Sequence, residues 1–277
     1  MMNEASIQVQ EWALGTLGVG VTLALGVRAG WCGETGSAFA IMVAYVTIVW
    51  RTAPAFRLRL LVNYGLVWAA YAGSSPVIEA LHLPLQNETL LTADRRLFGE
   101  TPSIALSAFR QRWIGETLSL GYLSYQIYLH WALLEAGWKP AEWRGQLSRL
   151  VFTAFAVGLA GYYLFPAASP YLAYAGLYER PIAGGWLTHF NEALNARMGA
   201  RYDAFPSLHV LITLTLLAFD WSRLRWRFWV MLGPSILMII GTLALRLHYA
   251  VDLLAGVALF AALTLFWHGN EQVASAP

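Results

Sequence analysis

The chain has 277 residues, of which 58% are hydrophobic and only 12% are charged, and its formal net charge is +2. Soluble domains carry about 25% charged residues, so this low charge and a mean hydropathy of +0.51 indicate a surface that faces lipid. The small net charge, without a Lys/Arg tract or zinc-finger spacing, argues against nucleic acid as a partner. A single cysteine, Cys32, excludes an internal disulfide framework.

Eight mostly apolar segments approach the roughly 20 residues that a transmembrane helix needs. They lie at 10–28, 36–50, 58–79, 116–137, 149–165, 206–221, 228–246 and 250–268. We therefore expect an all-α polytopic membrane protein with about eight transmembrane helices. Residues 1–57 are predicted to form an N-terminal pair of helices, and residues 58–277 a catalytic core of about six helices.

Two long connections are expected to lie on the outer side. Residues 85–115 mix apolar residues with Asp94, Arg95, Arg96 and Glu100, a pattern that indicates a helix lying in the membrane interface. Residues 166–205 are rich in Pro, Gly and Tyr and form a long loop, and such loops are often functional.

The short loops carry most of the arginines that indicate orientation, because cytoplasmic loops are enriched in Lys and Arg. These loops follow the second, fourth and sixth helices, and they contain Arg51, Arg57, Arg59, Lys139, Arg144, Arg149, Arg223, Arg225 and Arg227. With eight helices, all three loops fall on one side. We therefore expect a multi-pass protein with both termini in the cytoplasm and its active site at the outer, periplasmic or lumenal, face.

Two short histidine motifs carry the strongest chemical signal. Residues 205–209 read Phe-Pro-Ser-Leu-His and open the sixth predicted helix, and residues 248–252 read His-Tyr-Ala-Val-Asp and open the eighth. One helix leads away from His209 and the next leads back to His248, so both histidines are expected at the same face. This topology allows a shared site.

The residue types in these motifs suit proton transfer and nucleophilic attack. Four positions separate His248 from Asp252, so on a helix the two side chains share a face. A carboxylate at one imidazole nitrogen fixes the tautomer and leaves the other nitrogen with a directed lone pair. His209 lies where an acid would protonate a departing alkoxide. Pro206 suits the first turn of a helix, where Ser207 and free amide groups would bind phosphate.

Together, Pro206-Ser-Leu-His209 and His248-x-x-x-Asp252 resemble the motifs of the type 2 phosphatidic acid phosphatase superfamily. The Phe-Pro-Ser-Leu-His form and the His-Tyr followed by Val-Asp-Leu resemble the branch that contains fungal inositol phosphorylceramide synthase. Sphingomyelin synthases share the later His-Tyr-x-x-Asp pattern. The resemblance covers roughly residues 90–260.

This resemblance implies a two-step reaction without a metal or other cofactor. His248 would attack phosphorus and form a phosphohistidine, Asp252 would orient it, and His209 would protonate the leaving group. Water or a lipid hydroxyl would then release the phosphoryl group. The substrate is expected to be a lipid phosphate or phospholipid, and the sequence leaves hydrolysis by a lipid phosphatase and transfer by a headgroup phosphotransferase both open.

The predicted phosphate-binding residues are Arg180, Ser207, Arg201 and Arg246, since phosphoryl transfer needs fixed donors around the charge. Arg180-Pro181 resembles the end of the superfamily's Lys-x6-Arg-Pro motif, but Ala173 stands at the Lys position. Gly241-Thr242 stands where the phosphatases have Ser-Arg.

Three alternatives remain open. The first is a metal site, because His209, His248 and Asp252 are residue types that also bind metals. The other two are a non-catalytic lipid-binding protein and a lipid-flipping protein that keep the same fold.

Asp203 is expected to cap or pair locally at the start of the sixth helix. The remaining histidines, which we expect to be structural, are His82, His130, His189 and His268.

Overall fold

The computed structural model describes residues 7–31, 33–53, 57–178 and 180–274. Over these ranges the fold is all-helical, and one isolated bridge joins Ala167 to Asp203. The predicted all-α class is therefore confirmed.

Each of the eight apolar segments is helical. In the described part of the chain, the eight long helices are α1 (Val9–Ala29), α2 (Glu34–Arg51), α3 (Arg57–Ala80), α6 (Arg112–Ala136), α7 (Ala141–Leu164), α10 (Leu208–Arg223), α11 (Arg225–Ala244) and α12 (Ala250–Ala274). Within the described ranges, three helices are long and apolar enough to cross a membrane: α7, α11 and residues Ala250–Trp267 of α12. These three helices indicate a membrane protein.

The two long connections contain more helix than the sequence predicted. Residues 85–115 form two short helices, α4 (Asn87–Phe98) and α5 (Pro102–Leu106), rather than one. Gly99 ends α4 with a φ of 85°, a left-handed conformation that glycine adopts without a steric cost. The second connection holds α8 (Pro170–Ala173), the 3-10 helix η1 (Ala175–Leu177) and α9 (Trp186–Met198), and is therefore not a simple loop.

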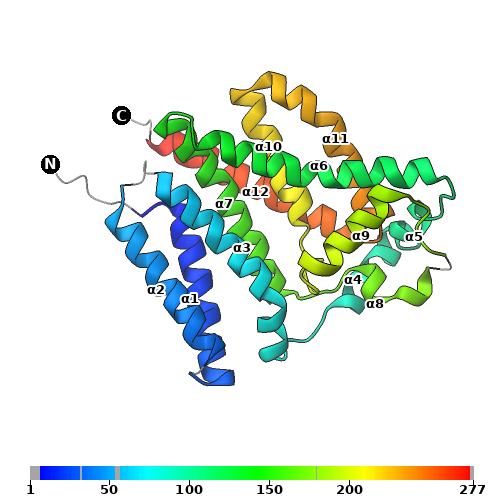
Figure 1. Cartoon of the computed structure of the whole chain (residues 1–277), viewed down its shortest axis with the longest axis horizontal. Coiled ribbons are helices and arrows are strands. Elements are labelled where there is room, and N and C mark those ends of the chain that lie inside the picture. The colour runs from blue at the N-terminus through cyan, green and yellow to red at the C-terminus, as the bar shows by residue number, and fades with distance from the viewer. Residues whose placement is uncertain (1–6, 32, 54–56, 179, 275–277) are drawn as a thin grey trace.

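Figure 1 shows how these elements are arranged. The helices α1 and α2 lie side by side on one side of the molecule, next to α3 and α7, while α4, α5, α8 and α9 gather on the other side. The helices α1, α3 and α7 all begin at one end of the long helices (Figure 1). The connections that carry the histidine motifs lie at the opposite end, because α10 and α12 both begin there.

The turn after α10 departs from the loop that we expected. Only Leu224 separates α10 from α11, so Arg225 and Arg227 are helical. The Arg227 side chain is fully buried and donates to both carboxylate oxygens of Asp220, at 2.7 and 2.6 Å, and it also contacts Glu135. Removing one partner of such a buried pair costs about 3–5 kcal/mol. Arg227 therefore joins α6, α10 and α11 instead of facing the membrane surface.

Candidate active site

The two histidine motifs meet where α10 and α12 begin. Ser207 is the N-cap residue of α10, and His209 is the second residue of that helix. Pro206 therefore precedes the cap, whereas the sequence placed it in the first turn. His248 lies two residues before α12, and Asp252 lies in its first turn. The backbone N–H of Ser207 donates to the carbonyl oxygen of Asp252 at 3.1 Å, which ties the two motifs together.

The imidazole rings of His209 and His248 meet edge to face, with His209 Nδ1 3.2 Å from His248 Nε2. His248 Nδ1 lies 2.8 Å from the carbonyl oxygen of Ala204. A carbonyl oxygen can only accept, so Nδ1 carries the hydrogen and Nε2 of the neutral ring has a free lone pair. His209 Nδ1–H must then be the donor of the bond between the rings. The geometry makes His248 the proton acceptor and His209 the proton donor.

Asp252 is fully buried beside His248. Its Oδ2 lies 3.4 Å from His248 Nδ1 and accepts from the backbone N–H of Tyr249 at 2.8 Å. Asp252 thus fixes the backbone at the start of α12 as well as contacting the imidazole. The nearer partner of Nδ1 is the Ala204 carbonyl, which no side-chain pattern reveals.

Asp94 is a residue of this site whose role the sequence did not show. It comes from α4, is fully buried, and accepts from the backbone N–H groups of Ala250 at 3.1 Å and Val251 at 2.9 Å. A carboxylate at this position satisfies free donors and the positive end of the helix dipole. Burial raises the pKa of Asp94, while the two amide bonds oppose that increase. Asp94 therefore holds the start of α12, and with it the segment that carries His248.

Two glycines of α7 allow the first motif to approach closely. A methyl group at Gly158 would collide with the Leu208 side chain, and one at Gly161 would collide with the ring of Pro206. Both glycines precede the Phe165–Pro166 segment and face the chain around the N-cap of α10. The backbone that carries His209 thus rests directly on α7.

Asp203 has a distant partner rather than the local one that we expected. Its Oδ2 accepts from the Tyr71 hydroxyl of α3 at 2.6 Å. The next residue, Ala204, donates its N–H to the carbonyl oxygen of Ala167 at 3.0 Å. These bonds fix the loop that presents the Ala204 carbonyl to His248. Burial raises the pKa of Asp203, and the contact with Tyr71 opposes it.

A cavity of about 370 Å³, called here the His209 cavity, opens beside His209. The His209 ring packs on Tyr122 and Tyr125, with ring centroids 5.0 and 4.6 Å apart. The walls are mainly aromatic and apolar, and they include Tyr64, Val67, Trp68, Tyr71, Tyr122, Tyr125, His130, Phe155, Tyr162, Leu194, Asn195, Met198 and Asp203. A cavity with this lining suits an apolar molecule with a few polar groups.

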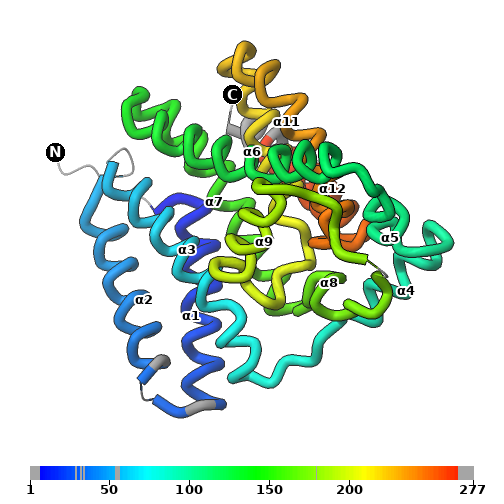
Figure 2. Tube along the Cα trace, turned by 45° about the vertical axis from the view of Figure 1, so that its right-hand side comes forward, coloured from blue at the N-terminus to red at the C-terminus, as the bar shows by residue number. Residues whose placement is uncertain are grey.

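Helix α9 supplies Leu194, Asn195 and Met198 to the wall of the His209 cavity. It packs against α6, and Figure 2 shows the two helices next to each other. The carboxylate of Glu116 accepts from the N–H groups of Gly185 and Thr188, at 2.7 and 3.1 Å, at the start of α9. Further along, Tyr122 donates to Asn195 at 3.0 Å. This role of Glu116 could not be predicted from the sequence, because its partners lie about 70 positions away.

The predicted phosphate-binding residues are not gathered at one point. Arg246 is 9% exposed and lies two residues before His248, and it lines a second cavity of about 320 Å³. Its Nη2 donates to the carbonyl oxygen of Arg180 at 2.7 Å, and the Arg180 side chain is exposed. Arg201 pairs with Glu79 at 3.3 Å on the surface. Ser207 is buried, and its hydroxyl caps α10 through Val210 N–H at 3.5 Å.

The described part of the chain contains no group of three or more His, Cys, Asp or Glu side chains arranged to hold a metal ion. The polar groups at the start of α10 and α12 are instead two imidazoles and buried carboxylates that bind backbone N–H groups. This arrangement provides one lone pair, one proton donor and fixed positions for both.

Comparison with known protein families shows where the chain belongs. The family model of the PAP2 superfamily matches residues 88–266, which is more than half of the chain and includes both histidine motifs. No curated protein and no solved structure was found to match the chain. The matched residues run from α4, which supplies Asp94, to α12, which supplies Asp252. The chain belongs to the PAP2 superfamily.

Proposed function

We propose that this chain is a membrane enzyme that cleaves a lipid phosphate ester through a phosphohistidine at His248. Membership of the PAP2 superfamily, which suggests a phosphatase or phosphotransferase, supports this proposal. The observation that carries the proposal is the contact between His209 Nδ1 and His248 Nε2, at 3.2 Å, with His248 Nδ1 held by the Ala204 carbonyl.

In the first step, the lone pair of His248 Nε2 attacks phosphorus and the bond from phosphorus to the leaving oxygen breaks. His209, protonated on both nitrogens beside the negatively charged phosphate, donates its Nδ1 proton to that oxygen and becomes a neutral imidazole, so that a neutral alcohol departs. The substrate enters between the two rings, which separates them. Asp252 and the Ala204 carbonyl stabilise the positive charge that develops on His248.

In the second step, an oxygen nucleophile attacks the phosphohistidine and the N–P bond breaks. His209, now without its proton, accepts the proton of the nucleophile and returns to its first state. Water as nucleophile gives a lipid phosphatase, and a lipid hydroxyl gives a headgroup phosphotransferase. The resemblance to inositol phosphorylceramide synthase supports transfer.

Arg246 is the best supported of the four proposed phosphate-binding residues. Its guanidinium is held by Arg180 and lies 4.4 Å above the Tyr178 ring. Its buried Nε atom has no hydrogen-bond partner among the described residues, so it keeps a donor for a phosphate oxygen. Arg180, Arg201 and Ser207 remain proposed ligands that would act after a movement of the surrounding loop.

We also propose that all eight long helices cross the membrane, with the histidines at the outer face and both termini in the cytoplasm. The arginines at the ends of α2 and α10 and at the start of α3 and α11 support this orientation. In this arrangement the α1–α2 pair is an addition to a six-helix catalytic core that starts at α3. The aromatic lining of the His209 cavity supports a lipid as substrate.

The test is an activity assay on the purified full chain in lipid vesicles. Labelled phosphatidic acid, isoprenyl pyrophosphate and phosphoinositide serve as donors. Release of inorganic phosphate identifies hydrolysis, and a new labelled lipid identifies transfer. If every donor remains intact, the enzymatic proposal is wrong and a lipid-binding or lipid-flipping role replaces it.

A further inference from the structure

A polar groove lies at the end of the long helices that is opposite to His209. It consists of two adjoining cavities of about 240 and 290 Å³, which share Gln8, Glu142 and Gly145. We call it the α7 groove, because residues of the first three turns of α7 line both cavities. Since α7 rises about 1.5 Å per residue over its 24 residues, the groove is separated from the histidine pair by most of the length of the helix.

Positive charge predominates in the α7 groove. Four arginines and two glutamates line it: Arg59, Arg144, Arg149, Arg223, Glu11 and Glu142. Glu11 pairs with Arg59 at 3.1 Å, which neutralises one charge of each sign. The Glu142 side chain is exposed and lies 4.0 Å from Arg223. The remaining excess of positive charge favours an anion.

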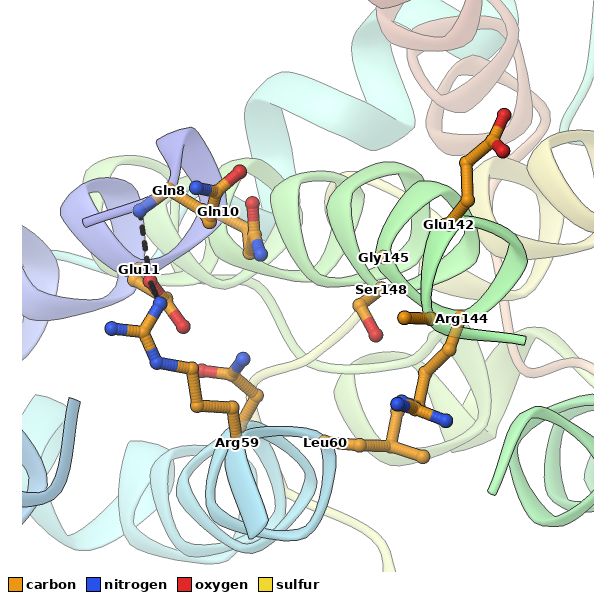
Figure 3. A pocket seen from close by; sticks show the side chains of 11 residues that line it. Gln8, Gln10, Glu11, Arg59, Leu60, Glu142, Arg144, Gly145 and Ser148 are labelled. Carbon is orange, nitrogen blue, oxygen red and sulfur yellow. Dashed lines mark hydrogen bonds and ion pairs between the residues drawn. The ribbon is translucent and has the colours of Figure 1, made fainter. Parts of the chain in front are cut away.

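Several polar atoms in the groove have no partner among the described residues. They are the Nε atom of Arg149, the side-chain carbonyl oxygens of Gln10 and Gln146, and the carboxylate oxygen Oε1 of Glu11. Gln10 is 4% exposed and lines the groove. Figure 3 shows Gln10 and Ser148 on facing walls, with Arg144 beside Ser148. Buried polar groups without partners cost stability, so these atoms indicate a bound molecule that donates and accepts hydrogen bonds.

The first turn of α7 adds to the attraction for an anion. Pro140 is the N-cap residue, and no described side chain caps the first turn. The positive end of a helix dipole and its free N–H groups bind phosphate. A phosphate accepts from arginine and from N–H groups, while its own hydroxyl, or the hydroxyl or ammonium groups of a headgroup, donate to Gln10 and Gln146.

We propose that the α7 groove binds a phosphate group at the membrane face opposite to the histidine pair. The phosphate belongs either to the headgroup of an anionic lipid or to free inorganic phosphate. This site is separate from the proposed reaction, so it binds its ligand whether or not the chain turns over a substrate.

The test measures binding to the full chain that carries His248→Ala, so that lipid is not consumed. Native mass spectrometry measures the binding of phosphatidic acid, with phosphatidylcholine as the reference lipid. The shift in unfolding temperature measures the binding of inorganic phosphate. Two variants change the groove differently: Arg149→Gln removes a charge, and Gly145→Leu fills the space. An added Cβ at Gly145 meets no atom within 4 Å, so this variant keeps the fold. Gly233→Leu, on an exposed and equally open position of α11, is the matched control.

We expect both groove variants to lower the affinity for phosphatidic acid at one of its binding sites about tenfold or more. This change corresponds to the loss of a charge-assisted hydrogen bond. The control keeps full binding. If inorganic phosphate stabilises the chain and Gly145→Leu removes that effect, free phosphate is sufficient. If the groove variants lose binding of phosphatidic acid only, the ligand is a lipid headgroup. Equal binding of both probes by the groove variants and the control overturns the proposal.

Discussion

His209 Nδ1 lies 3.2 Å from His248 Nε2, although 39 positions separate the two residues. The Ala204 carbonyl accepts from His248 Nδ1 on the other side of the ring. A chain of hydrogen bonds therefore runs from His209 through His248 to the backbone of the loop between α9 and α10. These hydrogen bonds make His248 Nε2 the acceptor and His209 Nδ1 the donor.

His248→Ala is expected to abolish turnover and the phosphorylated protein, because no other lone pair occupies the place of Nε2. His209→Ala is expected to slow formation of the phosphorylated protein by about 10²–10⁴-fold, the usual contribution of a general acid. Single-turnover experiments with a labelled donor and an alkaline quench measure both effects. A His248→Ala protein with full activity would remove the basis of the proposed mechanism.

Asp94→Ala is expected to lower stability by about 0.5–2 kcal/mol, because the N–H groups of Ala250 and Val251 lose their cap. The same change lets the His248 segment move, so turnover falls as well. Asp94→Asn keeps an acceptor oxygen and should recover part of both. Denaturant unfolding and the turnover number are the measurements, and unchanged values for Asp94→Ala contradict the positioning role.

Gly161→Ala is expected to destabilise the chain by about 1–3 kcal/mol, the usual cost of overpacking. The added methyl group meets the Pro206 ring, which is too rigid to move aside. Turnover should also fall, because the displaced backbone carries His209. Gly65→Ala is the control, since a methyl group at that position of α3 meets nothing within 4 Å. If both variants unfold at the same temperature, the close contact between α7 and Pro206 is not important.

Asp203 is expected to make stability depend on pH. Burial raises its pKa, so the folded chain binds a proton more tightly than the unfolded chain does. Its contribution to stability is then greatest at low pH and is lost as pH rises from about 4 through the raised pKa. Asp203→Asn does not titrate, so its unfolding temperature relative to that of the native chain should increase toward neutral pH. A constant difference across this range would show that burial does not perturb Asp203.

The local features of this protein follow from its sequence. The apolar segments predict the long helices because a segment in lipid must satisfy its backbone hydrogen bonds internally, which a helix does. The family could be recognised because residues 205–209 and 248–252 are short, contiguous motifs. The topology also brings His209 and His248 to one end of the bundle. The eight membrane crossings and the branch of the superfamily remain predictions.

The contacts that position the site depend on tertiary structure. Asp94 caps a helix that begins 156 positions later, and Tyr71 holds Asp203 from 132 positions away. The Ala204 carbonyl is a backbone group, so no residue type marks it. The sequence therefore determined which residues can carry the chemistry, whereas the packing of α3, α4 and α7 around the starts of α10 and α12 decided their partners, because hydrogen bonds between distant segments leave no periodic pattern in the chain.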